Sequence, residues 1–119
     1  MKKIVAGTVI LLCRDEVRFL VEKKEEQYHF ITREAVPEKT NLGVIVEALK
    51  EMKLPMDQLE LADLVDVRYE EIQHLPLYVF QLSLDQLPSL PSQYEWIGTH
   101  RFRELIGKVQ FQEITQFYS

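Results

Sequence analysis

Apolar residues dominate the first part of the chain and predict strands. The run Ile4–Cys13 is rich in β-branched residues and predicts a central strand that is covered on both faces. A polar turn at residues 14–16 separates it from residues 17–22, where apolar and polar residues alternate as in the second strand of a hairpin. A charged loop at residues 23–27 then leads to a short predicted strand at residues 28–31.

Residues 42–52 carry the clearest helical pattern in the chain. They follow a predicted loop at residues 32–41, in which Thr40 or Asn41 can cap the helix N-terminus. The apolar residues of this segment recur at helical spacing and form one face: Val44, Ile45, Ala48, Leu49 and Met52. Pro55 is expected to end the helix, because proline interrupts the backbone hydrogen-bond ladder.

The second half of the chain predicts another hairpin, a short strand and further helices. The expected positions are residues 59–68 and 75–83 for the hairpin, 94–97 for the strand, and 100–106 and 109–117 for the helices. Because neighbouring strands are mostly joined by short turns, the sheet should be mixed rather than purely parallel. We therefore predict a single domain over residues 1–119 of the α/β (α+β) class, with helices packed on the faces of a mixed β-sheet.

The composition is that of a globular protein with an acidic balance. Of the 119 residues, 46% are hydrophobic and 28% are charged, and the formal net charge is −5. Binding to a nucleic acid duplex requires clustered lysine and arginine, and here 14 basic residues stand against 19 acidic ones. No nucleic acid duplex is therefore expected as a partner, although a nucleotide ligand is compatible with local positive charge or a divalent metal.

The cysteine content and the N-terminal segment indicate the compartment. The single cysteine, Cys13, ends the first apolar run and is predicted to be a buried strand thiol, so no disulfide forms within the chain. The N-terminal segment lacks the cleavage pattern of a signal peptide and is too short for a spanning helix. We expect no membrane association and a cytoplasmic location.

The first strand and the order of the elements resemble a known family. The segment Ala6-Gly7-Thr8-Val9-Ile10-Leu11-Leu12 resembles the opening strand of the Nudix (MutT-like) hydrolases. The order of elements after it is similar to theirs over nearly the whole chain. Residues 94–97, followed by Arg103-Glu104-Leu105, resemble the final strand and helix entry of the family. The resemblance implies a Nudix-like mixed β-sheet.

The signature box of the family aligns with residues 32–54. It reads Gly, five residues, Glu, seven residues, Arg-Glu, an apolar residue, any residue, Glu-Glu, any residue, Gly and an apolar residue. The matching positions are Glu38, Glu47, Ala48, Glu51 and Leu54. The departures are Thr32 at the first Gly, Val46 at the Arg, Lys50 at the first residue of the Glu pair and Lys53 at the later Gly. The chain thus resembles a divergent member with a degenerate box.

The resemblance implies roles for two box carboxylates. Glu47 and Glu51 are expected to be catalytic residues and ligands of Mg²⁺ or Mn²⁺, and Glu47 would also help to deprotonate the attacking water. Their spacing supports a shared site, because residues four apart on a helix have Cβ atoms about 6 Å apart. Arg33 could contact a substrate phosphate and Glu38 could support the box; for both, a plain solvent-facing position is the alternative.

The departures weaken the expected metal site. The ammonium of Lys50 would compete with a metal for Glu47 and Glu51. Because Lys50 stands where the box has a glutamate, the metal also loses one ligand of the six or so that it prefers. Val46 removes an arginine that, by the resemblance, orients the box carboxylates. A missing ligand could come from the acidic turn at residues 70–71. Alternatively, Glu47, Lys50 and Glu51 form only a solvated helix face.

Three hypotheses follow for the function. The first is a Nudix-fold protein that is weak or inactive as a hydrolase and acts as a ligand- or protein-binding module, with no cofactor. It would bind a nucleotide-like small molecule or form a homodimer through a sheet edge or the apolar C-terminal tail. The second is an active, metal-dependent hydrolase that cleaves a diphosphate linkage in a nucleoside diphosphate derivative. The third is an unrelated α/β domain.

Overall fold

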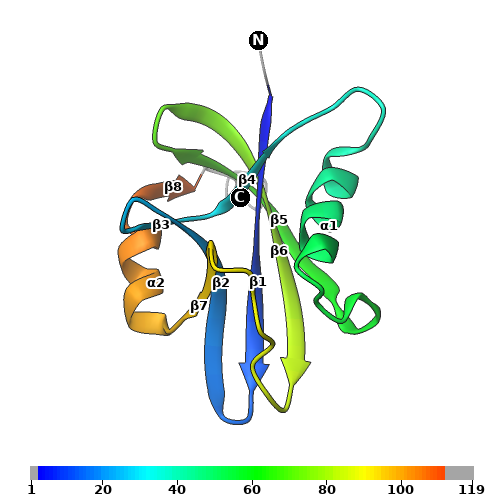
Figure 1. Ribbon diagram of the computed structural model, residues 1–119. Coiled ribbons are helices and arrows are strands. Elements are labelled where there is room, and N and C mark those ends of the chain that lie inside the picture. Colours follow the sequence, from blue (N-terminus) through cyan, green and yellow to red (C-terminus); the bar gives the residue numbers. More distant parts are fainter. Residues whose placement is uncertain (1–2, 112–119) are drawn as a thin grey trace, which may run out of the picture.

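A computed structural model describes residues 3–111 (Figure 1). The strands are β1 (Ile4–Cys13), β2 (Glu16–Lys24), β3 (Gln27–His29), β4 (Ile31–Glu34), β5 (Glu60–Tyr69), β6 (Ile72–Leu84), β7 (Tyr94–Ile97) and β8 (Val109–Phe111). The helices are α1 (Asn41–Glu51), the 3₁₀ turn η1 (Met56–Gln58) and α2 (Thr99–Ile106). None of the helices within this described part is long and apolar enough to cross a membrane.

The strands of residues 3–111 form one mixed sheet of eight strands. Six of them follow the order β3-β2-β1-β6-β5-β8, while β4 pairs with β1 and β7 pairs with β2. β1 and β6 are parallel, whereas the other described pairs are antiparallel. One edge of β1 pairs with β6, and the other edge is shared by two strands. On that edge β4 pairs with the first residues of β1, and β2 pairs with the last residues of β1. The predicted fold class, a mixed sheet with helices on its faces, is confirmed.

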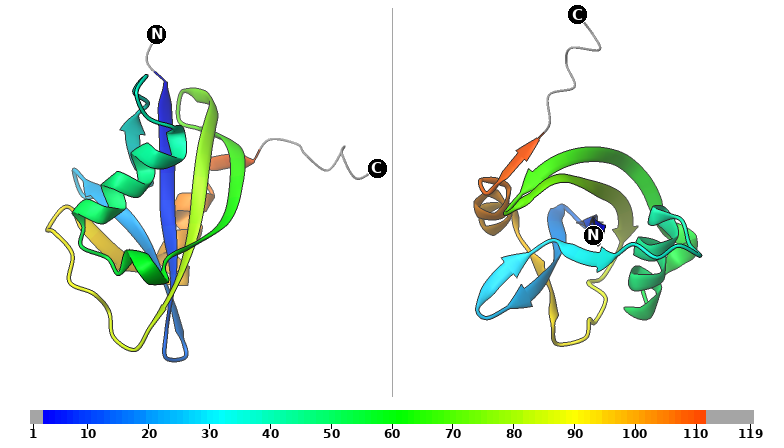
Figure 2. Two further views of the ribbon diagram at one scale, coloured as in Figure 1. Left: turned by 90° about the vertical axis from the view of Figure 1, so that its right-hand side faces the viewer. Right: turned by 90° about the horizontal axis from the view of Figure 1, so that it is seen from above.

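The two helices cover opposite faces of the curled sheet (Figure 2). The α1 face contains the apolar residues of the predicted helix face, including Ile45 and Leu49, packed against Val9 of β1 and Phe80 of β6. The α2 face contains Leu105 and the aromatic core that surrounds Phe30. Each face thus has its own buried cluster, and β1 lies between them.

Gly7 allows α1 to lie close to β1. A Cβ atom built on Gly7 would lie 2.7 Å from Cγ2 of Ile45, well inside van der Waals contact. Because Ile45 is fully buried, its side chain cannot move out into solvent to make room. The glycine of the opening strand is therefore required by the packing of the helix on the sheet.

The cap of α1 agrees with the sequence prediction. Thr40 is the N-cap, and its hydroxyl accepts a hydrogen bond of 2.9 Å from the backbone N–H of Gly43. The chain leaves the helix through Lys53, which has a left-handed backbone conformation with φ of 62°. In the predicted alignment with the Nudix box, glycine stands at this position, and only glycine adopts that conformation without steric cost.

Replacing Lys53 by glycine is therefore expected to stabilise the protein. The substitution removes the steric cost of a left-handed backbone at a residue other than glycine. The greater backbone entropy of glycine in the unfolded chain offsets part of this effect, so the free energy of unfolding should rise by about 0.5–1 kcal/mol. Thermal unfolding of the Lys53→Gly variant measures the gain. Lys53→Ala serves as the control and should give no gain, because alanine has the same left-handed penalty as lysine.

Four sequence predictions are corrected. The predicted strand at residues 28–31 is divided into β3 and β4, and residues 32–34, predicted as loop, belong to β4 because they pair with the start of β1. Residues 23–24, predicted as loop, extend β2 because they pair with β3. Residues 109–111, predicted as the start of a helix, form β8 because β5 provides a strand partner. The rest of that predicted helix, residues 112–117, lies outside the described residues.

Candidate functional site

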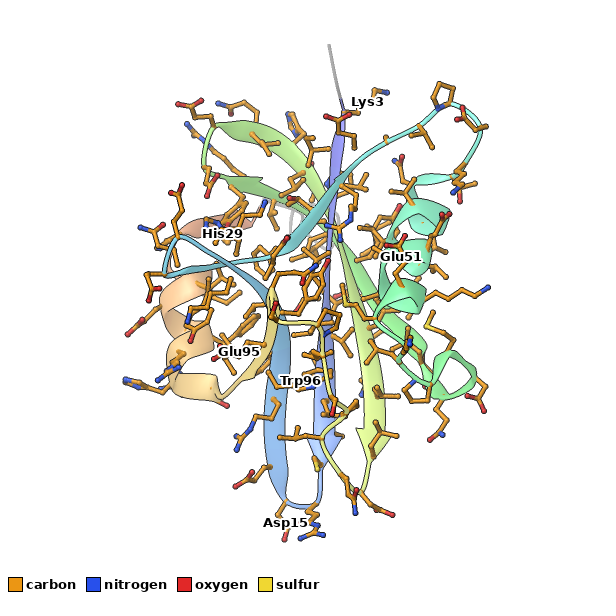
Figure 3. The ribbon with its side chains drawn as sticks, in the orientation of Figure 1. Lys3, Asp15, His29, Glu51, Glu95 and Trp96 are labelled. Atoms are coloured by element: carbon orange, nitrogen blue, oxygen red, sulfur yellow. The ribbon has the colours of Figure 1, made fainter. Side chains whose placement is uncertain are left out.

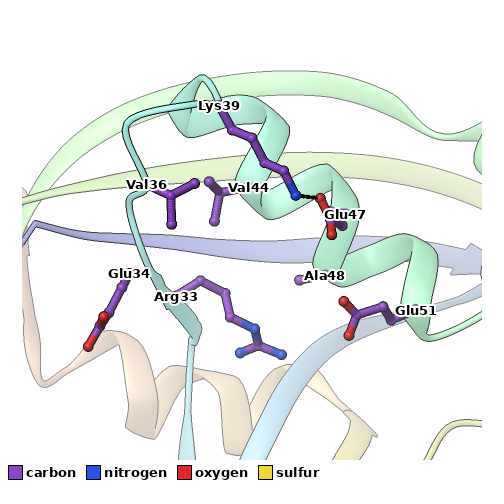
Figure 4. A pocket seen from close by; sticks show the side chains of 8 residues that line it. All are labelled: Arg33, Glu34, Val36, Lys39, Val44, Glu47, Ala48 and Glu51. Carbon is purple, nitrogen blue, oxygen red and sulfur yellow. Dashed lines mark hydrogen bonds and ion pairs between the residues drawn. The ribbon is translucent and has the colours of Figure 1, made fainter.

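A pocket of about 170 Å³ lies between α1 and the segment that follows β4 (Figure 4). Its lining residues are Arg33, Glu34, Val36, Lys39, Val44, Glu47, Ala48 and Glu51. Val44 and Ala48 are buried members of the apolar face of α1, which positions the helix against the sheet. The same helix therefore directs Glu47 and Glu51, one turn apart, toward the pocket.

The pocket brings together three of the four predicted site residues, Arg33, Glu47 and Glu51. Arg33 comes from β4, whereas the two carboxylates come from α1. Glu38 does not line this pocket and lies exposed in the loop before α1. The spacing of the helix predicted the pair of carboxylates, but it does not predict the approach of β4.

A lysine contacts Glu47, but it is not the lysine that the sequence indicated. The ammonium of Lys39 donates to the carboxylate of Glu47, and both side chains are about half exposed (Figure 4). Lys50 is exposed and does not line the pocket. The reason is that Val36 packs against the core, which brings the following loop residues over the first turns of α1.

Arg33 is held by groups of the protein itself. Its guanidinium donates hydrogen bonds to the backbone carbonyl of Thr32, at 2.7 Å, and to the hydroxyl of Tyr94. It also lies 3.8 Å from the carboxylate of Glu22 on β2, whose side chain is only 12% exposed. An arginine offers five N–H donors, so this arrangement orients the guanidinium and leaves donors for a ligand.

Glu22 is a residue that the sequence analysis did not single out. It occupies a polar position in the alternating pattern of a hairpin, which predicts exposure to solvent. In the structure its Oε1 atom is buried and accepts no hydrogen bond from any group within residues 3–111. Its nearest cations are Arg33, and Lys24 at 3.9 Å. Because this contact joins β2 and β4, which do not follow each other along the chain, the alternating pattern of β2 alone does not reveal it.

The side chains of the pocket do not form a complete coordination site for a metal ion. Over the described range 3–111, no group of three or more His, Cys, Asp and Glu side chains is placed to hold a metal ion. Glu47 and Glu51 offer carboxylates from one helix face, but Lys39 already neutralises Glu47. Mg²⁺ demands nearly octahedral oxygen coordination, so these two residues would leave most of its ligands to water.

The charges of the pocket limit the kind of ligand it can take. The lining residues include three with carboxylates, Glu34, Glu47 and Glu51, and two with cationic side chains, Arg33 and Lys39. An isolated phosphate group would therefore meet a pocket with an excess of negative charge. A phosphate accompanied by a divalent cation would be neutralised.

Comparison with known proteins identifies the fold. No family model matches the sequence, and no curated protein matches it. The structure resembles the Ap4A hydrolase of C. elegans with a TM-score of 0.67 and 12% identity over 90% of this chain and 87% of that one. It also resembles a Listeria monocytogenes protein described as a candidate NUDIX hydrolase, with a TM-score of 0.54 and 15% identity over 88% and 83%. The chain has the Nudix fold.

A third structure matches this Nudix fold over the whole of this chain and nearly the whole of the other. It is the C-terminal domain of mouse MUTYH in a complex with human PCNA, with a TM-score of 0.57 and 14% identity. The match covers 100% of this chain and 98% of that domain. At these identities the similarity establishes the fold alone, so the alignment of residues 32–54 with the Nudix box stays a prediction.

The acidic turn after β5 does not contribute to the pocket beside α1. Glu70 lines another cavity of this protein, where its carboxylate lies 3.4 Å from Nδ1 of His29, and Glu71 lines a third. His29 and Glu51 lie on opposite sides of the molecule (Figure 3). Burial and the neighbouring carboxylate of Glu70 raise the pKa of Tyr69 to about 12. The turn therefore does not supply the missing metal ligand.

Proposed function

We propose that this Nudix-fold protein is a ligand-binding module with little or no hydrolase activity. The observation that carries the proposal is the ion pair between the ammonium of Lys39 and the carboxylate of Glu47. The resemblance implies that Glu47 would be a metal ligand. A tethered cation at this carboxylate opposes the binding of a second cation.

The chemistry of diphosphate cleavage explains why this arrangement disfavours catalysis. The reaction requires the charge on two phosphoryl groups to be neutralised and a water to be held in line, which a metal does when several carboxylates fix it. Of the two predicted metal ligands, Glu47 contacts Lys39, whereas Glu51 has no lysine contact among residues 3–111. Val46, at the position of the box arginine, packs against the α1 core instead of supporting a carboxylate.

The ligand that fits best is a nucleotide-like molecule bound together with a divalent cation. Arg33 and Lys39 offer donors for phosphate oxygens, and Glu51 offers a ligand for Mg²⁺ or Mn²⁺. The volume of about 170 Å³ is smaller than that of a typical small-molecule site, which spans roughly 300–1,000 Å³. The pocket would thus hold the phosphate end of the ligand, with the remainder outside it.

A hydrolysis assay tests this proposal. Dinucleoside polyphosphates and nucleotide sugars are incubated with the protein and with its Glu51→Gln variant, in the presence of Mg²⁺ or Mn²⁺. We expect equal, background release of phosphate-containing products from both proteins, and nucleotide binding by the wild type only when a cation is present. Turnover by the wild type that is abolished in Glu51→Gln would instead support an active hydrolase.

The active hydrolase remains the second candidate function. It is favoured by the position of Glu47 and Glu51 on one pocket and by the similarity in fold to an Ap4A hydrolase. In that case both carboxylates would hold Mg²⁺ or Mn²⁺ after Lys39 has moved away. A role in binding another protein is favoured by the full-length match to a domain found in a complex with PCNA.

A further inference from the structure

The carboxylate of Glu22 does not line the pocket beside α1, but it contacts one of the cations that do. Its Oε1 atom lies 3.8 Å from Nη1 of Arg33, and its side chain is only 12% exposed. The second cation beside it, Lys24 at 3.9 Å, is 55% exposed. Solvent screens a buried pair of charges much less than an exposed one. The negative charge of Glu22 therefore acts mainly on Arg33.

The sheet fixes the place of this carboxylate. Glu22 lies directly opposite His29 of β3 on one edge of β2 and opposite Tyr94 of β7 on the other. Directly opposite residues share a face of the sheet. The hydroxyl of Tyr94 accepts a hydrogen bond from Nη2 of the same Arg33 that Glu22 approaches. Because β2 is paired on both edges here, Glu22 cannot move away from Arg33 without disturbing the sheet.

Arg33 can donate hydrogen bonds to a ligand, but its charge is already offset. It extends from β4 into the pocket that α1 lines (Figure 4). The carbonyl of Thr32 and the hydroxyl of Tyr94 take two of its five N–H donors. Both of these acceptors are neutral, whereas Glu22 brings a full negative charge. A phosphate at Arg33 would thus find free donors without a free positive charge.

The other cation of the pocket is offset in a weaker way. Lys39 contacts Glu47, and both side chains are about half exposed. An exposed pair of this kind is worth little and is readily exchanged for water or a ligand. Glu22 is mostly buried and held by two strands, so its effect on Arg33 persists when a ligand binds. Of the two pairs, the buried one is therefore the stronger barrier to an anion.

We propose that Glu22 is a specificity-determining residue that keeps the pocket from binding a phosphate group without a cation. A phosphate at Arg33 would be repelled by the carboxylate of Glu22, and a cation that accompanies the phosphate would cancel this repulsion. The proposal rests on the proposed function, because it requires the phosphate end of the ligand to reach Arg33. It assigns the choice between bare and cation-bound phosphate to a residue outside the lining of the pocket.

The Glu22→Gln variant tests this role, because it removes the charge at nearly unchanged shape. Calorimetry measures the affinity for inorganic pyrophosphate in EDTA and in Mg²⁺. In EDTA we expect Glu22→Gln to bind roughly tenfold more tightly than the wild type, as removal of a charge several ångströms away implies. In Mg²⁺ the difference should be smaller. Thermal unfolding checks that the variant is folded, and Glu22→Ala provides a second neutral variant with the same expected gain.

Two further variants show whether the effect passes through Arg33. The carboxylate of Glu95 also lies near an arginine, at 3.6 Å from Arg101, but neither residue lines the pocket, so Glu95→Gln should leave the affinity unchanged. Adding Arg33→Ala to Glu22→Gln should abolish the gain, because the effect depends on the guanidinium.

The results separate this inference from the proposed function. Unchanged affinity of both neutral Glu22 variants in EDTA would overturn the inference, and so would an equal gain in Glu95→Gln or a gain that persists without Arg33. A wild type that does not bind pyrophosphate in Mg²⁺ would contradict the proposed function. In that case a gain of Glu22→Gln in EDTA that requires Arg33 would still support the role of Glu22.

Discussion

Replacing Gly7 by alanine is expected to lower the free energy of unfolding by about 1–3 kcal/mol, as extra volume does in a well-packed core. The new Cβ would lie 2.7 Å from Cγ2 of Ile45, a side chain that is fully buried between α1 and the sheet. Either α1 moves away from β1 or Ile45 leaves its rotamer. Since α1 carries Glu47 and Glu51, the first response would also move the pocket. Urea or thermal unfolding measures the loss.

Two further variants test the cause of this loss. Ile45→Leu removes the branched Cγ2 at nearly constant volume, so the double variant with Gly7→Ala should lose less stability than the two single changes together. Gly107→Ala is the matched control, because its Cβ would meet only ordinary contacts, with the nearest atom, the Arg103 carbonyl oxygen, at 3.4 Å. A Gly7→Ala variant as stable as the Gly107→Ala variant would show that α1 does not pack against Gly7.

Replacing Arg33 by alanine is expected to cost about 1–3 kcal/mol, because it leaves buried polar groups without their partner. The guanidinium joins the Thr32 carbonyl and the Tyr94 hydroxyl, and it is the nearer of the two cations beside the buried carboxylate of Glu22. The change should also weaken nucleotide binding if Arg33 contacts phosphate. Unfolding and binding measurements on the same variant separate the two contributions.

A second arginine of this chain provides the control. Arg101 also donates to a tyrosine hydroxyl, that of Tyr28, and lies 3.6 Å from a carboxylate, that of Glu95, but its side chain is 60% exposed. Arg101→Ala should therefore cost less than about 1 kcal/mol, as exposed ion pairs do. Adding Glu22→Gln to Arg33→Ala should recover part of the lost stability. Equal losses for Arg33→Ala and Arg101→Ala would exclude a structural role for the buried pair.

The sequence predicted the elements whose pattern is local. The β-branched run of β1, the hairpin of β5 and β6, and the capped, amphipathic α1 were each indicated by their own residues. The predicted elements were wrong where pairing with another strand determines the structure. Residues 32–34 and 109–111 become strands only because β1 and β5 offer free edges to them. No local propensity contains that information.

The same distinction holds for the candidate site. Helical spacing was sufficient to predict that Glu47 and Glu51 share a face, and both line the pocket. The contacts that alter their chemistry depend on tertiary structure. Lys39 reaches Glu47 through a loop anchored by Val36, and Glu22 approaches Arg33 across strands. The helical pattern alone therefore indicated Lys50, and not Lys39, as the lysine that would compete with a metal.

The affinity for Mn²⁺ decides whether Lys39 holds the position of a metal. Titration calorimetry on the wild type, Lys39→Ala and Lys50→Ala compares the two lysines under the same conditions. An exposed ion pair is worth about 0.2–1 kcal/mol, so Lys39→Ala should tighten Mn²⁺ binding by about 1.4-fold to fivefold. Lys50→Ala should leave it nearly unchanged. Equal effects of the two substitutions, or tight binding by the wild type that Lys39→Ala does not improve, would contradict this role of Lys39.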